Sequence, residues 1–155
     1  MLRKIVESGE PTSRERVAQF EQRWHVELPE SYRAFLVSTN GGRPVPGAFP
    51  IGGMEGNPVG VLQAFFGLDN KIRSLDLDWT LENLGVPQPR GLVPIGCTEG
   101  DDFVCISTLD PGQPVVFWDR MACWGKGEWS SSDFYPVTED FERLLAALHD
   151  FELSP

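Results

Sequence analysis

The chain has 155 residues, of which 41% are hydrophobic and 23% charged, and its formal net charge is −10. This composition is typical of one soluble globular domain, and no stretch approaches the roughly 20 apolar residues of a membrane span. The acidity argues against binding to nucleic acids or anionic membranes, because both require a basic patch.

Two helices are predicted in the first 40 residues. The first spans residues 12–24, where Thr12 and Glu15 have the spacing of a capping box. Its apolar stripe consists of Val17, Phe20 and Trp24. The second spans about residues 29–39 and ends at residues 40–42, Asn-Gly-Gly, because these residues readily adopt a left-handed backbone. Its apolar face consists of Tyr32, Phe35 and Leu36.

The next segment combines short strands with a third helix. Residues 48–51 predict an edge strand, because Pro50 cannot donate a ladder hydrogen bond, and residues 61–68 predict a buried strand. Helical spacing resumes over residues 70–84, and Gly85 ends the helix. Two apolar lines run along this helix: Ile72, Leu75 and Trp79 form one, and Leu77, Leu81 and Leu84 form the other. We expect Trp79 to belong to the core.

The C-terminal part predicts a meander followed by a helix. Three short apolar runs separated by turns predict antiparallel strands at residues 92–95, 103–108 and 115–118. Residues 120–135 show no clear period and predict an exposed loop. Thr138 then caps a helix whose apolar residues recur with helical spacing: Phe141, Leu144, Leu145, Leu148 and Phe151. This order predicts an α+β single domain with a central, mostly antiparallel sheet flanked by helices.

Residue types that carry chemistry form no recognisable site. The histidines and cysteines lack metal-binding spacing: His25, Cys97, Cys105, Cys123 and His149. The odd number of cysteines favours reduced thiols in the cytoplasm over a disulfide framework. We therefore predict no metal, no cofactor and no catalytic residue. Two carboxylate pairs, Asp76 with Asp78 and Asp101 with Asp102, leave a small hydrolase as an alternative, although a solvated turn and a helix face also explain them.

The candidate binding residues lie mainly in the acidic C-terminal part. Residues 97–155 carry 12 acidic and three basic side chains, whereas residues 1–96 carry 11 and 10. This imbalance would speed the encounter with a basic protein, although acidity also serves simply to keep small proteins soluble. Tryptophans in a polar segment either anchor a partner or fold back onto a small core. The candidate partner-binding residues are acidic or aromatic residues of predicted loops: Glu55, Asp101, Asp102, Asp119, Trp124, Trp129 and Asp133.

A series of short motifs resembles the SUKH superfamily, which contains the Smi/Knr-type domains. The first is Leu-Pro-Glu-Ser-Tyr-Arg-Ala-Phe-Leu at residues 28–36, followed by Asn-Gly-Gly at residues 40–42. Later motifs include Leu-Val-Pro-Ile-Gly at residues 92–96, Val-Val-Phe-Trp-Asp at residues 115–119 and Phe-Glu-Arg-Leu-Leu at residues 141–145. The resemblance covers about residues 20–151 of a single domain, 1–155. It departs from the family at Gly-Asp-Asp, residues 100–102, where two glycines are frequent.

The resemblance implies an α+β fold without enzymatic activity. Bacterial members resemble immunity proteins, which neutralise a cognate secreted toxin, often a nuclease, whereas fungal members resemble regulatory scaffolds in cell-wall signalling. We expect the bacterial type: a cytoplasmic monomer or weak dimer that occludes the active surface of a basic toxin domain, with no nucleic-acid or membrane partner. The regulatory scaffold is the alternative.

Overall fold

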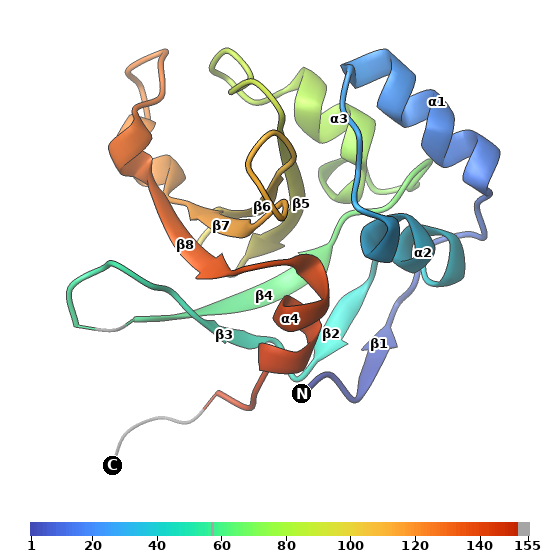
Figure 1. Cartoon of the computed structure of the whole chain (residues 1–155), viewed down its shortest axis with the longest axis horizontal. Coiled ribbons are helices and arrows are strands. Elements are labelled where there is room, and N and C mark those ends of the chain that lie inside the picture. The colour runs from blue at the N-terminus through green and yellow to red at the C-terminus, as the bar shows by residue number, and fades with distance from the viewer. Residues whose placement is uncertain (57, 152–155) are drawn as a thin grey trace.

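The computed structural model describes residues 1–56 and 58–151, and shows a curved sheet packed against helices (Figure 1). The strands are β1 (Lys4–Val6), β2 (Arg43–Val45), β3 (Ala48–Pro50), β4 (Val59–Phe65), β5 (Leu92–Thr98), β6 (Phe103–Ser107), β7 (Val115–Trp118) and β8 (Phe134–Thr138). The helices are α1 (Arg14–Trp24), α2 (Glu30–Ser38), α3 (Leu77–Glu82) and α4 (Phe141–Ala147). Three short 3-10 helices are η1 (Arg73–Leu75), η2 (Arg120–Cys123) and η3 (Ser131–Asp133).

Six strands form one antiparallel sheet in the order β3-β4-β5-β6-β7-β8, so each strand pairs with the next one along the chain. This arrangement confirms the predicted α+β fold with a mostly antiparallel sheet. The pair β1–β2 lies beside β4, because Gly42 and Phe65 exchange two backbone hydrogen bonds of 3.1 and 2.8 Å. The edge position of β3 agrees with the prediction made from Pro50.

Both edges of the sheet are engaged by backbone contacts. At β3, Ala48 and His149 exchange two hydrogen bonds of 3.1 and 2.9 Å. The loop after β3 reaches across to β8, where the Gly52 N–H donates to the Pro136 carbonyl oxygen at 2.8 Å. Because an unpaired edge is a template for association with other chains, these contacts protect the sheet against edge-to-edge pairing.

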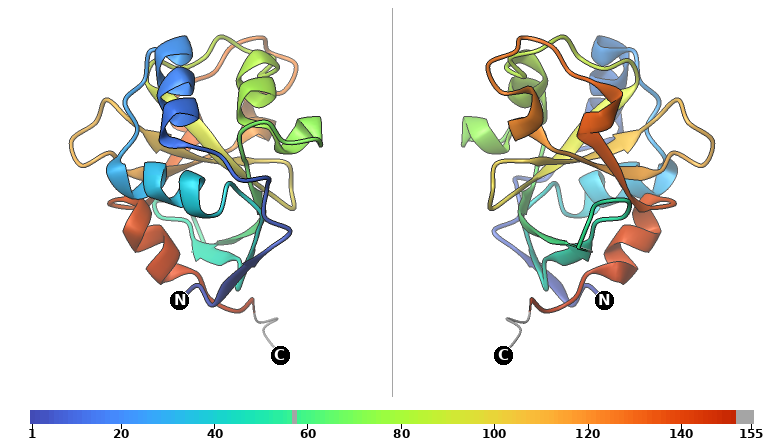
Figure 2. Two further views of the ribbon diagram at one scale, coloured as in Figure 1. Left: turned by 90° about the vertical axis from the view of Figure 1, so that its right-hand side faces the viewer. Right: turned by 90° about the vertical axis from the view of Figure 1, so that its left-hand side faces the viewer.

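Helices α2 and α4 pack against each other beside the sheet (Figure 2), and an aromatic cluster joins them to it. Tyr32 and Phe35 of α2 meet Phe141 of α4 at ring-centroid distances of 5.1 and 5.2 Å. Phe35 also meets Phe65 of β4 at 5.1 Å. These edge-to-face contacts are favourable beyond the area that they bury. The predicted apolar face of α2 is therefore confirmed, and residues 40–42 all have the positive φ angles expected where the helix stops.

The third helix is much shorter than the apolar spacing predicts. Residues 70–84 form η1 and the six-residue α3, because the Asp76 side chain accepts the Trp79 N–H and begins a new helix there. One apolar line is buried as predicted: Leu77, Leu81 and Leu84. Ile72 of the other line is 58% exposed, and Trp79 is half-buried. The second line therefore faces outward instead of joining the core.

Other differences concern helix ends and short strands. Ser13 and Asp140, rather than Thr12 and Thr138, cap α1 and α4 by accepting the backbone N–H three residues later. Helix α4 ends at Ala147, so Phe151 lies outside it and is exposed. The strands β1, β2 and β8 have three to five residues and no sustained alternation, which explains why the sequence pattern does not predict them.

Candidate functional site

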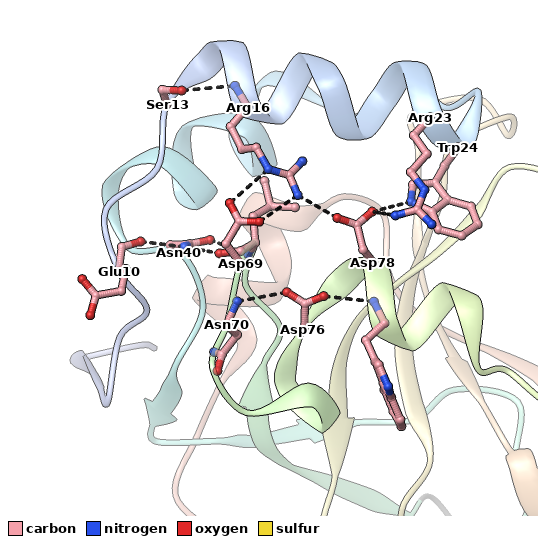
Figure 3. Close-up of polar contacts among 12 residues, drawn as sticks. Glu10, Ser13, Arg16, Arg23, Trp24, Asn40, Asp69, Asn70, Asp76 and Asp78 are labelled. Atoms are coloured by element: carbon pink, nitrogen blue, oxygen red, sulfur yellow. Dashed lines mark hydrogen bonds and ion pairs between the residues drawn. The ribbon is translucent and has the colours of Figure 1, made fainter.

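An ion-pair network fixes α3 against α1 (Figure 3). At its centre, the Asp78 carboxylate accepts hydrogen bonds from Arg16 Nη2 and Trp24 Nε1, both at 2.7 Å, and pairs with Arg23 Nη1 at 3.2 Å. The Asp78 side chain is only 13% exposed, so these donors replace the water that it has lost. Arg16 also binds Asp69 through two 3.0 Å hydrogen bonds, the main cause of the raised pKa of its guanidinium.

A second carboxylate sets the start of α3. Asp76 accepts the Trp79 backbone N–H through one oxygen and the Asn70 N–H through the other, both at 3.0 Å (Figure 3). Asp76 therefore connects the preceding loop to the first turn of the helix, where a carboxylate also suits the helix dipole. Together with Asp78, it determines where Trp79 and Asn83 stand above the sheet.

A groove of about 480 Å³ lies between this helix and the sheet. Its wall comes from residues 72–83, where Ile72, Leu75 and Trp79 are apolar and Ser74, Thr80 and Asn83 are polar. Its floor comes from three neighbouring strands: Gln63 and Ala64 of β4, Cys97 of β5 and Phe103 of β6. Each end carries one basic and one acidic residue, Arg43 with Glu7 at the β1–β2 end and Arg120 with Asp101 at the other.

Arg120 stands where the groove meets the segment after β7. Its guanidinium carbon lies 4.1 Å from the centroid of the Phe103 ring, and Nη1 donates to the Asp101 carbonyl oxygen at 3.4 Å. The Asp102 carboxylate accepts the Arg120 backbone N–H at 2.9 Å and so fixes the start of η2. Within the part of the chain that the structure describes, Arg120 forms no ion pair. This half-buried cation remains available to an anionic group from outside.

Residues 119–133, here called the tryptophan loop, connect β7 to β8 and contain η2 and η3. Trp124 is 74% exposed, and Met121 is exposed in the same loop. Trp129 is turned partly inward, because its ring meets Phe134 edge-to-face at 5.9 Å. The sequence leaves two alternatives open for these tryptophans. Trp129 folds back onto the protein, whereas Trp124 projects from it and is free to anchor a partner.

The tryptophan loop and the groove adjoin. A second cavity, of about 500 Å³, is bordered by Trp124 and by the segment after α3. It shares Asn83 and Arg120 with the groove. The exposed indole and the groove are therefore parts of one continuous surface, with Arg120 between them.

The structure brings part of the predicted partner-binding set to this surface. Asp101 lines the groove, while Asp119, Trp124 and Trp129 belong to the tryptophan loop. Glu55 is exposed on the loop between β3 and β4, and this loop lies apart from the tryptophan loop (Figure 1). All five residues stay candidates. Asp101 and Trp124 line the two cavities that share Arg120, and Trp129 lines a third cavity, which shares Cys123 with that of Trp124.

Two members of the predicted set have structural positions instead. Asp133 is 5% exposed, and its carboxylate accepts the Ser130 N–H at 2.8 Å in a capping box. This carboxylate therefore caps the tryptophan loop, and its role in partner binding stays a prediction. Asp102 is half-buried and holds the backbone of Arg120. Its sequence neighbour Asp101, with φ of 63° in the left-handed region, is exposed.

Sequence analysis misses the groove itself. Helical spacing predicts a core position for Trp79, and it assigns no role to Arg43 or Arg120. The sequence does contain a signal for the wall of the groove. A helix that buries the face of Leu77 and Leu81 in the core cannot bury its other apolar face, that of Trp79, against the same core. The charged ends, in contrast, depend on which strands lie side by side, and no local pattern records this.

The pKa of Asp102 gives a pH-dependent prediction. Burial raises this pKa above its ordinary value of 3.8, so the folded protein holds the proton more tightly than the unfolded chain does. Stability from this group is present below pH 3.8 and is lost as the pH rises through the raised pKa. The free energy of unfolding of Asp102→Asn, minus that of the wild type, should therefore increase over this interval in urea titrations. A difference that is independent of pH would contradict the assignment.

The remaining reactive groups also have structural positions. The described residues contain no group of three or more His, Cys, Asp or Glu side chains that could hold a metal ion. Cys97, Cys105 and Cys123 are free thiols. Burial raises the pKa of the Cys97 and Cys105 thiols, which keeps both protonated and poorly nucleophilic at neutral pH.

These observations define a class: a small α+β domain whose polar groups mainly support its structure and whose groove and exposed indole suit binding. Residues 11–147 match the SMI1 / KNR4 family (SUKH-1), and the chain belongs to this family, as its motifs predict. Members of this family are typically non-catalytic. Searches of the curated proteins and of the solved structures gave no match. Among the described residues, no helix has the length and apolar character needed to cross a membrane.

Proposed function

We propose that this chain is an immunity-type binding protein, which acts in the cytoplasm and neutralises a basic toxin domain by covering its active surface. Membership of the family supports an immunity-type or Smi/Knr-type domain. The observation that carries the more specific proposal is Trp124, an indole 74% exposed on a loop bordered by acidic side chains. Large exposed aromatic residues of this kind anchor protein partners.

The distribution of ion pairs leaves negative charge free around this anchor. Many acidic residues of the N-terminal part are paired, as Asp78 is with Arg16 and Arg23. On and beside the tryptophan loop, in contrast, Asp101 and Asp119 form no ion pair with any described residue. Unpaired carboxylates attract a basic partner over distance, while the indole provides the short-range contact.

Binding to a purified toxin domain tests the proposal. A suitable candidate is the variable C-terminal domain of the nearest large secreted protein encoded in the same genome. Trp124→Ala should weaken the complex by about tenfold or more, because truncation of a central aromatic anchor typically costs about 2 kcal/mol. Asp101→Lys should slow association and reduce its dependence on salt.

Glu142→Lys provides the matched control for Asp101→Lys. It changes the net charge by the same amount, but Glu142 is exposed on α4, far from the tryptophan loop (Figure 1). Its complex should therefore keep the wild-type association rate. Equal affinities for Trp124→Ala, Asp101→Lys and the wild type would show that this surface does not bind the toxin. A folded toxin domain that binds none of them would favour the regulatory scaffold.

A further inference from the structure

The groove beside α3 combines an apolar wall with a cation that has no anionic partner. Trp79 and Leu75 form this wall together with Ile72, which is 58% exposed although it is a large aliphatic residue. Arg120 lies over the Phe103 ring on the other side. A guanidinium held against an aromatic ring keeps its fork of donors fixed, and this geometry suits a carboxylate.

The use of arginine elsewhere in the chain makes this position unusual. Arg16 and Arg33, which are half-buried like Arg120, both form ion pairs with carboxylates. Among the described residues, four arginines form no ion pair: Arg43, Arg73, Arg90 and Arg120. Arg120 is the half-buried one of the four, and Arg43 and Arg120 line the groove. The groove thus contains two cations without ion pairs, Arg43 and Arg120, and two carboxylates without ion pairs, Glu7 and Asp101, one of each at either end.

The dimensions of the groove suit an extended chain segment. It crosses from Arg43 on β2 past β4 and β5 to Phe103 on β6. Neighbouring strands lie about 4.8 Å apart, so three steps span roughly 15 Å, the length of about four or five extended residues. Gln63 is exposed on the floor and can offer its amide to a peptide backbone.

We propose that the groove binds an extended segment of another protein, with a carboxylate side chain on Arg120 and an adjoining apolar side chain against Trp79 and Ile72. The wall buries the apolar side chain, and the guanidinium supplies the polar contact that fixes its register. This inference concerns the groove and not the indole of Trp124, so it stands whether or not the partner is a toxin.

Selection from a displayed library of random seven-residue peptides tests this inference on the full-length chain. The recovered peptides should share an Asp or Glu next to a large aliphatic or aromatic residue. Arg120→Gln and Ile72→Ser should each weaken their binding by about tenfold, which corresponds to the loss of one charge-assisted or apolar contact of about 1.4 kcal/mol. Both side chains lie at the surface of the groove, and circular dichroism confirms that the variants fold.

Two matched substitutions outside the groove serve as controls. Arg90→Gln removes an exposed arginine that, like Arg120, forms no ion pair with a described residue, and Leu109→Ser removes an aliphatic residue that is exposed like Ile72. Both should leave peptide affinity unchanged. The proposal is overturned if no peptide is enriched, if the recovered peptides are basic, or if the groove variants bind them as well as the controls do. Trp124 and Asp101, the residues that test toxin binding, are unchanged in all these variants, so the two proposals are tested by separate substitutions.

Discussion

Asn40→Ala should lower the free energy of unfolding by about 3–5 kcal/mol, one of the largest effects of any single substitution in this chain. The Asn40 side chain is buried, with 2% exposure, and makes three hydrogen bonds to backbone groups. Its Nδ2 donates to the carbonyl oxygens of Glu10 and Leu68 at 2.7 and 2.9 Å, and its Oδ1 accepts the Leu68 N–H at 2.7 Å (Figure 3). Alanine would leave the buried N–H and carbonyl oxygen of Leu68 without these partners.

Asn40→Gly separates the two contributions at this position. The φ angle of Asn40 is 51°, which asparagine tolerates better than alanine and which glycine adopts freely. Glycine should therefore recover the part of the loss due to the backbone, but not the part due to the hydrogen bonds. Asn83→Ala is the matched control, because the exposed Asn83 amide makes a single hydrogen bond to the Trp79 carbonyl oxygen. Chemical denaturation that shows equal losses at the two asparagines would contradict this account.

The position of Asn40 explains why the motif that ends α2 is Asn-Gly-Gly. A Cβ atom on Gly9 or on Gly67 would lie 2.4 Å from the Asn40 carbonyl oxygen, so both segments approach this residue as bare backbone. A Cβ atom on Gly41 would likewise lie 2.8 Å from the Phe65 carbonyl oxygen. Asn40 therefore joins the N-terminal segment, the end of α2 and the segment after β4 at one point.

Asp78→Ala should lower the free energy of unfolding by about 3 kcal/mol. The substitution removes the acceptor shared by Arg16, Arg23 and the Trp24 indole, and leaves the half-buried Arg16 with only the exposed Asp69. Asp78→Asn retains an oxygen for the indole and should lose less. Thermal or urea unfolding measures both effects.

Glu82→Ala is the control for this network. Glu82 lies on α3, as Asp78 does, and also pairs with Arg23 of α1. The Glu82 side chain is 43% exposed, whereas that of Asp78 is 13% exposed. Exposed ion pairs contribute about 1 kcal/mol or less, so Glu82→Ala should be nearly neutral. Because α3 carries the wall of the groove, Asp78→Ala should also weaken groove peptides, whereas Glu82→Ala should not. Equal stability losses for the two variants would show that burial does not govern this network.

The sequence predicts the fold well where one local rule is sufficient. The α2 pattern and the Asn-Gly-Gly stop hold because apolar spacing and left-handed residues act within a few positions. The strand Val115–Trp118 is found as predicted for the same reason. The long helix predicted over residues 70–84 is wrong, because Asp76 captures the Trp79 N–H and interrupts the continuous pattern. Competition between a side chain and the helical backbone is not visible in apolar spacing.

The candidate surface is less predictable than the fold. Acidic and aromatic loop residues identify Trp124 and Asp101, because exposure follows from polar surroundings. They also select Asp133, whose carboxylate turns inward to cap its own loop, and composition alone cannot distinguish these two uses of an aspartate. Arg120 escapes detection because its role depends on Phe103, a residue of β6 that is distant from it in the sequence.

Growth rescue tests the central claim most directly. The chain is co-expressed with the variable C-terminal domain of the nearest large secreted protein in its genome, and colony formation is scored with the wild type and with Trp124→Ala. We expect the wild type to restore growth and to form a stable complex on gel filtration, and Trp124→Ala to rescue poorly at the same expression level. Continued toxicity in the presence of the folded wild-type chain would contradict neutralisation of that toxin.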